Sequence, residues 1–182
     1  MKKGVLQGNG MHSEACVYTI LWSEVFRKEE IPDVVHAVAE AMGPAPTLPR
    51  YPVVGGSGLF IGLCIRLDLL AKLGEYDVLL RDIRAIFEPQ LKEGPGTLWE
   101  NQALSTSSRC HGFTSHTAVH LLRDLLGLDI PQVFDLDTRG AIPAEEQKKR
   151  ILQHSQHLCG LRWMRGCIET DAGILCREAD DR

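Results

Sequence analysis

Residues 94–127 read GPGTLWENQALSTSSRCHGFTSHTAVHLLRDLLG. A tryptophan–glutamate pair, Trp99–Glu100, follows a Gly-Pro-Gly turn, and His111 lies in a loop just before a segment of helical periodicity. Between residues 115 and 126 apolar side chains recur at three- and four-residue steps and Gly127 follows, which predicts a helix ending at that glycine. A carboxylate beside an indole, with a histidine supplied from a loop, suits a sugar-binding or hydrolytic site.

Towards the N-terminus, apolar periodicity predicts four further helices. Their expected ranges are residues 12–26, 31–42, 59–73 and 76–87. Ser13 is a candidate N-cap, Pro32 fits the first turn of the second helix, and Gly74 fits the end of the third. Short connections join these helices in pairs. The sequence therefore predicts a mainly α fold of about five helices in αα-hairpins, either a helical bundle or an α/α toroid.

After Pro131 the pattern changes. Two short runs of strand character, residues 161–168 and 174–176, flank an Asp-Ala-Gly turn and predict a β-hairpin. Residues 143–150 have the composition of a helix start, and the polar residues 177–182 are expected to fray. We place the domain boundary between residues 131 and 132.

Composition excludes several classes of partner. The chain has 20 Lys+Arg against 24 Asp+Glu, a net charge of −4, and no basic face, which argues against nucleic acid. No run approaches the roughly 18 apolar residues of a membrane span. The first ten residues lack the apolar core of a signal peptide, so we expect a cytoplasmic protein.

The six cysteines form no Cys-x-x-Cys pair, and we expect all of them to be reduced structural thiols. His116 and His120 lie four residues apart on the predicted helix, but no glutamate follows the first histidine as in a zinc-protease motif. We therefore predict no metal and no cofactor.

Several motifs resemble a known family. They are TLWE at 97–100, SRCHGFTS at 108–115 and LLRDLLGL at 121–128, with HSEAC at 12–16 and GLRWMRG at 160–166 in the same order. Together they resemble the C-terminal part of bacterial α-L-rhamnosidases of glycoside hydrolase family 78, within the six-hairpin glycosidase superfamily. The resemblance covers nearly the whole chain.

This resemblance implies a fold, a reaction and roles for three residues. The fold would be part of an (α/α)6 barrel over residues 1–131, followed by the start of a β-sandwich domain over residues 132–182. The reaction would be inverting hydrolysis of terminal α-L-rhamnosides, without a cofactor. Glu100 would be the general base that activates water, His111 would contact the rhamnose, and Trp99 would shape the pocket wall.

One departure from the family limits the expected activity. An inverting glycosidase needs an acid and a base whose carboxyl groups are roughly 6.5–9.5 Å apart. The Asp-rich motif that carries the family's acid has no counterpart here, and five helices cannot close a barrel of six hairpins. We therefore expect a truncated form that is inactive or impaired, since loss of the acid costs about 10²–10⁴-fold.

The alternative is a non-catalytic helical module that binds carbohydrate or a partner. In either case, helix faces that would pack on absent hairpins are expected to be exposed and to cause self-association.

Overall fold

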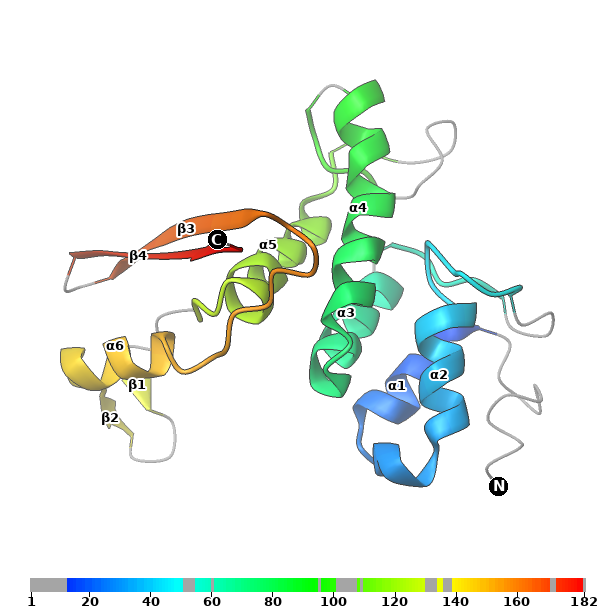
Figure 1. The fold of residues 1–182 in the computed structure, drawn as a ribbon, viewed down its shortest axis with the longest axis horizontal. Coiled ribbons are helices and arrows are strands. Elements are labelled where there is room, and N and C mark those ends of the chain that lie inside the picture. The colour runs from blue at the N-terminus through cyan, green and yellow to red at the C-terminus, as the bar shows by residue number, and fades with distance from the viewer. Residues whose placement is uncertain are drawn as a thin grey trace. The chain divides into compact units, whose positions relative to one another are not determined.

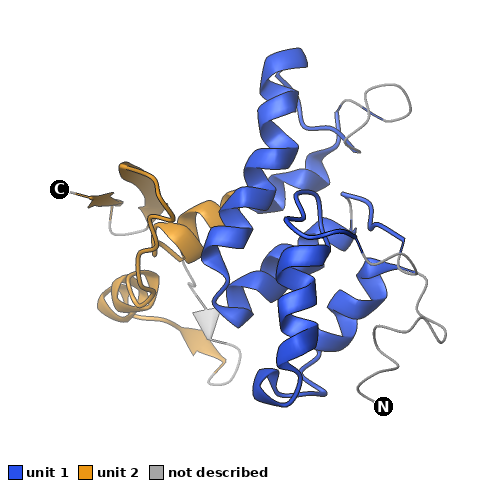
Figure 2. Cartoon of the chain, turned by 45° about the vertical axis from the view of Figure 1, so that its right-hand side comes forward, with its two compact units in different colours: residues 1–117 blue, residues 118–182 orange. Residues whose placement is uncertain are grey.

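The computed structural model describes residues 13–50, 55–59, 61–94, 96–100, 108, 110–129, 134–135, 139–170 and 173–181. The chain divides into two compact units, Met1–Thr117 and Ala118–Arg182 (Figure 2). This division falls inside the helical run that follows His111. The domain boundary at residues 131 and 132 stays a prediction, because compact units need not coincide with domains.

Unit 1 is helical, and its helices confirm the four predicted ones (Figure 1). They are α1 (Glu14–Trp22), α2 (Pro32–Ala41), α3 (Ile61–Leu73) and α4 (Tyr76–Glu93), with a 3-10 turn over Lys28–Glu30 before α2. Helix α4 continues past its predicted end and contains Pro89.

Three residues predicted to mark helix ends do so, although α1 ends at Trp22, four residues before its predicted end. The Ser13 side chain accepts a hydrogen bond from the backbone N–H of Ala15, so Ser13 is the N-cap of α1. Pro32 opens α2, where its missing N–H is not needed. Gly74 ends α3 with φ +81, a conformation that favours glycine.

The core of unit 1 forms where α1, α2 and α3 pack together. Its buried members are Val17, Tyr18, Leu21, Ile31, Val34, Val38, Met42 and Leu69. Trp22, one of the apolar residues whose spacing predicts the first helix, is 42% exposed. Its indole N–H donates to the Asp68 carboxylate, and the Lys72 ammonium lies 4.7 Å from its ring centroid. Trp22 therefore lies over the polar face of α3.

Unit 2 begins inside a helical run. A 3-10 turn over Gly112–His116 leads into α5 (Thr117–Val119) and a π-helical segment over His120–Leu125, and Gly127 follows with φ +74. These segments confirm the helix predicted over residues 115–126. Next come a two-stranded antiparallel pair, β1 (Phe134–Asp135) and β2 (Gly140–Ala141), and helix α6 (Ala144–Ile151).

A longer antiparallel hairpin closes unit 2 and confirms the predicted one. It consists of β3 (Trp163–Thr170) and β4 (Gly173–Asp180). One face of the hairpin packs on a small core of Leu126, Leu128 and Ile151. The fraying expected from residue 177 onward is wrong for residues 177–180. There Arg177 donates hydrogen bonds to the carbonyls of Gly127 and His154, and Ala179 is buried.

The prediction that all six cysteines are reduced is also wrong. Cys167 on β3 lies directly opposite Cys176 on β4, with their Cα atoms 4.1 Å apart, and the two form a disulfide. Cys16, Cys64, Cys110 and Cys159 are free thiols. The pair is set by the register of the hairpin, which cysteine spacing alone does not reveal.

Within the described residues, no helix combines the length and apolar character needed to cross a bilayer.

Candidate functional site

Hydrogen bonds join the segment that contains Glu100 to the one that contains His111, both in unit 1. The Glu100 N–H donates to the Ser108 carbonyl at 3.0 Å, and the His111 N–H donates to the Leu98 carbonyl at 2.8 Å. The Ser108 N–H in turn donates to Oε2 of Glu100 at 3.1 Å. We call this arrangement the Glu100–His111 site. Both residues are half-buried, and Nε2 of His111 is itself buried.

The Glu100 carboxylate is oriented by the bond from Ser108. That bond occupies Oε2, and among the described residues no hydrogen bond is made to Oε1. A carboxylate held through one oxygen can direct its other oxygen at a water molecule, which is the arrangement that a general base needs. Residues 101–107, which join the two segments, lie outside the described residues.

Trp99, by contrast, belongs to the core of unit 1. Its side chain is only 1% exposed, and its backbone N–H donates to Oε1 of Gln90 near the end of α4. A Cβ at Gly94 would come within 2.7 Å of the indole, so the absence of a side chain there lets the ring pack against the backbone. The indole therefore offers no exposed face to a sugar.

His111 lies at the start of the 3-10 turn Gly112–His116. Its carbonyl accepts hydrogen bonds from the backbone N–H of Thr114 at 3.3 Å and from the Thr114 hydroxyl at 2.9 Å. Thr114 is fully buried, so this turn is anchored in the core. The His111 ring lies 6.2 Å from the exposed ring of Phe113.

The two histidines that share the helical spacing of a zinc motif make separate contacts. Nδ1 of His116 donates to the Phe113 carbonyl at 2.8 Å, and Nδ1 of His120 donates to Asp124 at 2.6 Å. In the part of the chain that the structure describes, no three His, Cys, Asp or Glu side chains are grouped as they would be around a metal ion.

Unit 1 also contains a buried polar network that the sequence analysis missed. Glu14, 2% exposed, accepts hydrogen bonds from the Tyr18 hydroxyl at 2.8 Å and from Nη1 of Arg50 at 2.7 Å. Arg66, 1% exposed, donates from Nε to Asp82 at 2.6 Å and from Nη1 to the Tyr18 hydroxyl at 3.1 Å.

Burial governs the ionisation of this network. It raises the pKa of Tyr18 far above its ordinary value, and the Glu14 carboxylate adds to that rise despite the opposing effect of Arg66. Burial alone would lower the pKa of Arg66, but contacts with Tyr18 and Asp82 outweigh it and leave the pKa raised. Tyr18 is therefore neutral and Arg66 is charged at physiological pH.

A cavity of about 300 Å³ lies beside this network. Its polar side chains come from Glu14, Arg50, Ser57 and Arg66, and its apolar wall includes Leu59, Leu63 and Ile86. The sequence offers one signal for it, since Arg66 is an isolated charge inside the strongly apolar run 59–67. Its partners are distant in sequence, so their identity could not be predicted.

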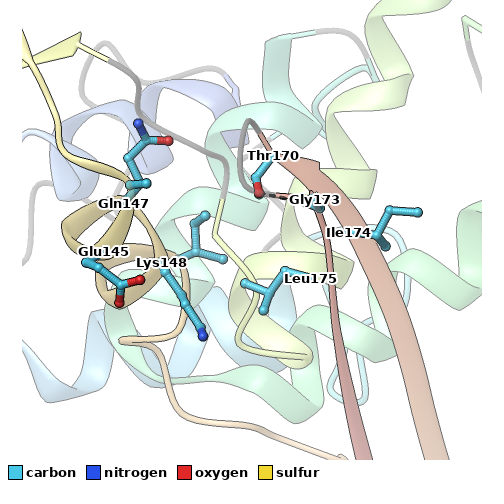
Figure 3. Close-up of a pocket in the computed structure, with 9 residues that line it drawn as sticks. Glu145, Gln147, Lys148, Thr170, Gly173, Ile174 and Leu175 are labelled. Atoms are coloured by element: carbon cyan, nitrogen blue, oxygen red, sulfur yellow. Dashed lines mark hydrogen bonds between the residues drawn. The ribbon is translucent and has the colours of Figure 1, made fainter.

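A second cavity, of about 250 Å³, lies in unit 2 between α6 and the β3–β4 hairpin (Figure 3). Glu145, Gln147 and Lys148 line it from the helix, and Thr170, Ile174 and Leu175 line it from the hairpin. The Thr170 hydroxyl is already used, because it donates to the Gly173 carbonyl at 2.7 Å.

Comparison with models of known protein families, with curated proteins and with solved structures finds no match to this chain.

Proposed function

We propose that the chain is glycoside hydrolase-like and directed at terminal α-L-rhamnosides, with Glu100 as the general base and His111 as a sugar contact. The observation that carries this proposal is the hydrogen-bonded pairing of residues 98–100 with residues 108 and 111. It joins the two motifs whose likeness to family 78 rhamnosidases suggests the activity, and both residues are only half-buried. The (α/α)6 toroid and the C-terminal β-sandwich are part of the same proposal.

The role of Trp99 in this proposal differs from that of a pocket wall. Because its indole is buried against Gly94, Trp99 acts by positioning the backbone of Glu100. The apolar surface for the sugar ring would then come from other residues.

Because the family's acid motif is absent, hydrolysis is expected only for a substrate whose leaving group needs no protonation. A general acid protonates the leaving oxygen, and 4-nitrophenolate departs without that help far more readily than an alkoxide does. We therefore expect slow hydrolysis of 4-nitrophenyl α-L-rhamnoside by the purified chain, and none of methyl α-L-rhamnoside.

The test compares Glu100→Gln with Glu93→Gln. Glutamine retains an oxygen that can accept the bond from Ser108 but cannot take a proton, so hydrolysis of the nitrophenyl substrate should fall by about 10²-fold or more. Glu93 is an exposed glutamate at the end of α4, and its replacement should leave the rate unchanged. Equal rates for wild type and Glu100→Gln would contradict the assignment of Glu100.

A non-catalytic carbohydrate-binding module is the second candidate. The missing acid motif favours it, because a site with only a base can hold a sugar without cleaving it. Binding of L-rhamnose by both wild type and Glu100→Gln, with no release of nitrophenol by either, would identify this function instead.

A further inference from the structure

The hairpin in unit 2 pairs β3 with β4 alone among the described strands, so each of the two strands has one outer edge (Figure 1). Thr170 and Gly173 are directly paired, with a turn of two residues between them. In a hairpin with such a turn the closing pair is hydrogen-bonded, and non-hydrogen-bonded and hydrogen-bonded pairs then alternate along the strands. The odd-numbered residues of β3 therefore direct their N–H and C=O groups away from β4.

Two distances agree with this alternation. The N–H of Asp181 donates to the Arg162 carbonyl at 3.0 Å, and this is the hydrogen-bonded pair expected one step beyond the strand ends. The Cα atoms of Cys167 and Cys176 lie 4.1 Å apart. That separation matches a non-hydrogen-bonded pair, at about 4.5 Å, better than a hydrogen-bonded one, at about 5.5 Å.

The two outer edges of the hairpin differ in what covers them. On β4 the Glu178 carbonyl, which the alternation turns outward, accepts a hydrogen bond from Nε2 of Gln156 at 3.0 Å. On β3 no residue that the structure describes forms a hydrogen bond with the outward backbone groups of Arg165, Cys167 or Glu169. A strand with an uncovered row of N–H and C=O groups can pair with a further strand. The edge of β3 is therefore open to such pairing.

The side chains of β3 leave one face of this strand free. Met164 and Ile168 pack against the small core of unit 2, whereas Arg165, Cys167 and Glu169 are exposed. A strand added beside β3 would extend the sheet in its own plane. Its odd-numbered side chains would then lie next to these three exposed residues, and the packing of the buried face would not change.

The charges on the exposed face of β3 are arranged symmetrically about Cys167. Arg165 precedes this cysteine by two residues, and Glu169 follows it by two. If two copies of β3 pair antiparallel with their cysteines opposite each other, Arg165 of each copy lies opposite Glu169 of the other. All of these positions have outward backbone groups, so the register consists of hydrogen-bonded pairs, and opposite charges across it favour pairing. The same construction on β4 would set Ile174 opposite Glu178, which gives no such match.

We propose that two copies of the chain form a dimer through antiparallel pairing of their β3 strands, centred on Cys167, which creates a continuous four-stranded sheet. The pairing is two-fold symmetric, so both contacts between Arg165 and Glu169 form together. The bond from Gln156 at the edge of β4 opposes the addition of further copies. The dimer goes beyond the proposed function, because it needs neither rhamnoside binding nor hydrolysis, and it does not use the helix faces of unit 1.

The first experiment measures hydrogen exchange of the backbone amides of the full ¹⁵N-labelled chain at increasing protein concentration. The amides of Arg165, Cys167 and Glu169 point away from β4 in the monomer and are hydrogen-bonded in the dimer, so their exchange should slow as the dimer forms. The outward amides of Ile174 and Cys176 on β4 are the internal control and should not change. Exchange at the three β3 amides that does not depend on concentration would overturn the proposal.

A charge reversal tests the register of the pairing. Glu169→Arg sets two arginines opposite each other at both contacts, so the dimer dissociation constant, measured by sedimentation equilibrium, should rise about tenfold or more. Glu169 faces Ile174 across the hairpin, so the change creates no like-charge pair with the facing strand of the same chain. Glu93→Arg makes the same change at an exposed position at the end of α4 and should leave the constant unchanged. Equal constants for wild type and Glu169→Arg would contradict the proposal.

Mixing two variants then separates this register from a general effect of charge. Arg165→Glu should also weaken the dimer, because it sets two glutamates opposite each other. In a mixed dimer of Arg165→Glu with Glu169→Arg, however, every contact again joins an arginine to a glutamate. The mixture should therefore associate about as tightly as wild type, although each variant alone is weak. Failure of the two variants to associate, with both folded by circular dichroism, would overturn the proposal.

The reversal at Glu169 decides the question even where Arg165→Glu does not fold. Arg165 faces Glu178 across the hairpin, so its replacement by glutamate places two carboxylates opposite each other within one chain. In that case the comparison of Glu169→Arg with Glu93→Arg and the exchange of the β3 amides are the measurements that count. A wild-type chain whose dimer forms without slower exchange at β3 associates through another surface and contradicts the proposal.

Discussion

Gly43 lies where the backbone runs close to the buried Arg66 side chain. Its φ of +85 lies in the region that favours glycine, and a Cβ there would come within 2.3 Å of Nε and Cζ of Arg66. Because Arg66 is held by Asp82 and by the Val38 carbonyl, its guanidinium cannot retreat. Because Gly43 has no side chain, the backbone there can lie directly against the buried Arg66 guanidinium.

We predict that Gly43→Ala destabilises the protein by about 3 kcal/mol or more, since the alanine adds a steric overlap to an unfavourable φ. Gly74→Ala is the matched control. Gly74 has φ +81 but no atom within 4 Å of the added Cβ, so only the backbone cost of roughly 1–2 kcal/mol applies. Urea unfolding of both variants measures the difference, and equal losses would show that Arg66 is not fixed.

Asp124 links the stability of unit 2 to pH. Burial would raise the pKa of this carboxyl group, but hydrogen bonds from His120 and Arg123 outweigh burial and lower the pKa below its ordinary 3.8. A folded-state pKa below the unfolded value means that ionised Asp124 stabilises the fold at neutral pH. This contribution is lost as the pH falls below about 4.

We therefore predict that Asp124→Asn lowers the free energy of unfolding at pH 7 and that its difference from wild type shrinks towards pH 3. Urea denaturation across this pH range measures the effect, with Asp181→Asn as an exposed control. A difference from wild type that stays constant from pH 7 to pH 3 would contradict the role of the Asp124 carboxylate.

At the scale of elements, the hairpin β3–β4 carries a cross-strand disulfide in addition to its backbone pairing. The disulfide joins the directly paired residues Cys167 and Cys176, nine residues apart. In the chain-entropy model, closing a loop of this size stabilises the folded state by about 2–3 kcal/mol. The hairpin is therefore expected to depend on redox conditions.

Replacing both cysteines by serine should lower the stability of the hairpin by about 2–3 kcal/mol, measured by hydrogen exchange of the β3 and β4 amides. Cys64→Ser, which removes an exposed free thiol, is the control. A thiol titration of the denatured, unreduced chain should count the four free cysteines, Cys16, Cys64, Cys110 and Cys159. Six reactive thiols would contradict the disulfide.

The elements also show what the sequence could predict. Apolar periodicity located α1 to α4, Ser13 located the start of α1 and Gly74 the end of α3, because these signals are local. The orientation of Trp22 was not predictable, since it depends on Asp68 and Lys72 of another helix. The same holds for β4, whose last residues are ordered by bonds from Arg177 to Gly127 and His154.

The candidate site shows the same difference between local sequence signals, which can be predicted, and long-range contacts, which cannot. The motifs containing Glu100 and His111 were recognised because each is short and continuous, and the structure adds the bonds that join them. The buried state of Trp99 and the network of Glu14, Tyr18, Arg66 and Asp82 depend on contacts between residues far apart in sequence. Such contacts leave no pattern in a single sequence.

At the scale of the whole molecule, apolar side chains remain exposed on the helices of unit 1. Ile61 on α3 is 58% exposed and Leu91 on α4 is 78% exposed. We predict that the chain self-associates with increasing concentration and that Leu91→Glu reduces the association, because a charge at this position opposes burial. Sedimentation velocity measures both, and a wild-type chain that stays monomeric at all concentrations would contradict the prediction.

Rhamnoside recognition at the Glu100–His111 site is the proposal that most needs a direct test. Titration of the ¹⁵N-labelled chain with L-rhamnose tests it most directly, using D-glucose as the stereochemical control and His111→Ala as the variant. We predict saturable shifts at the amides of Glu100, Ser108 and His111 with L-rhamnose only, and an affinity at least about threefold lower in His111→Ala. The absence of shifts at these amides, or equal affinity in His111→Ala, would contradict the claim.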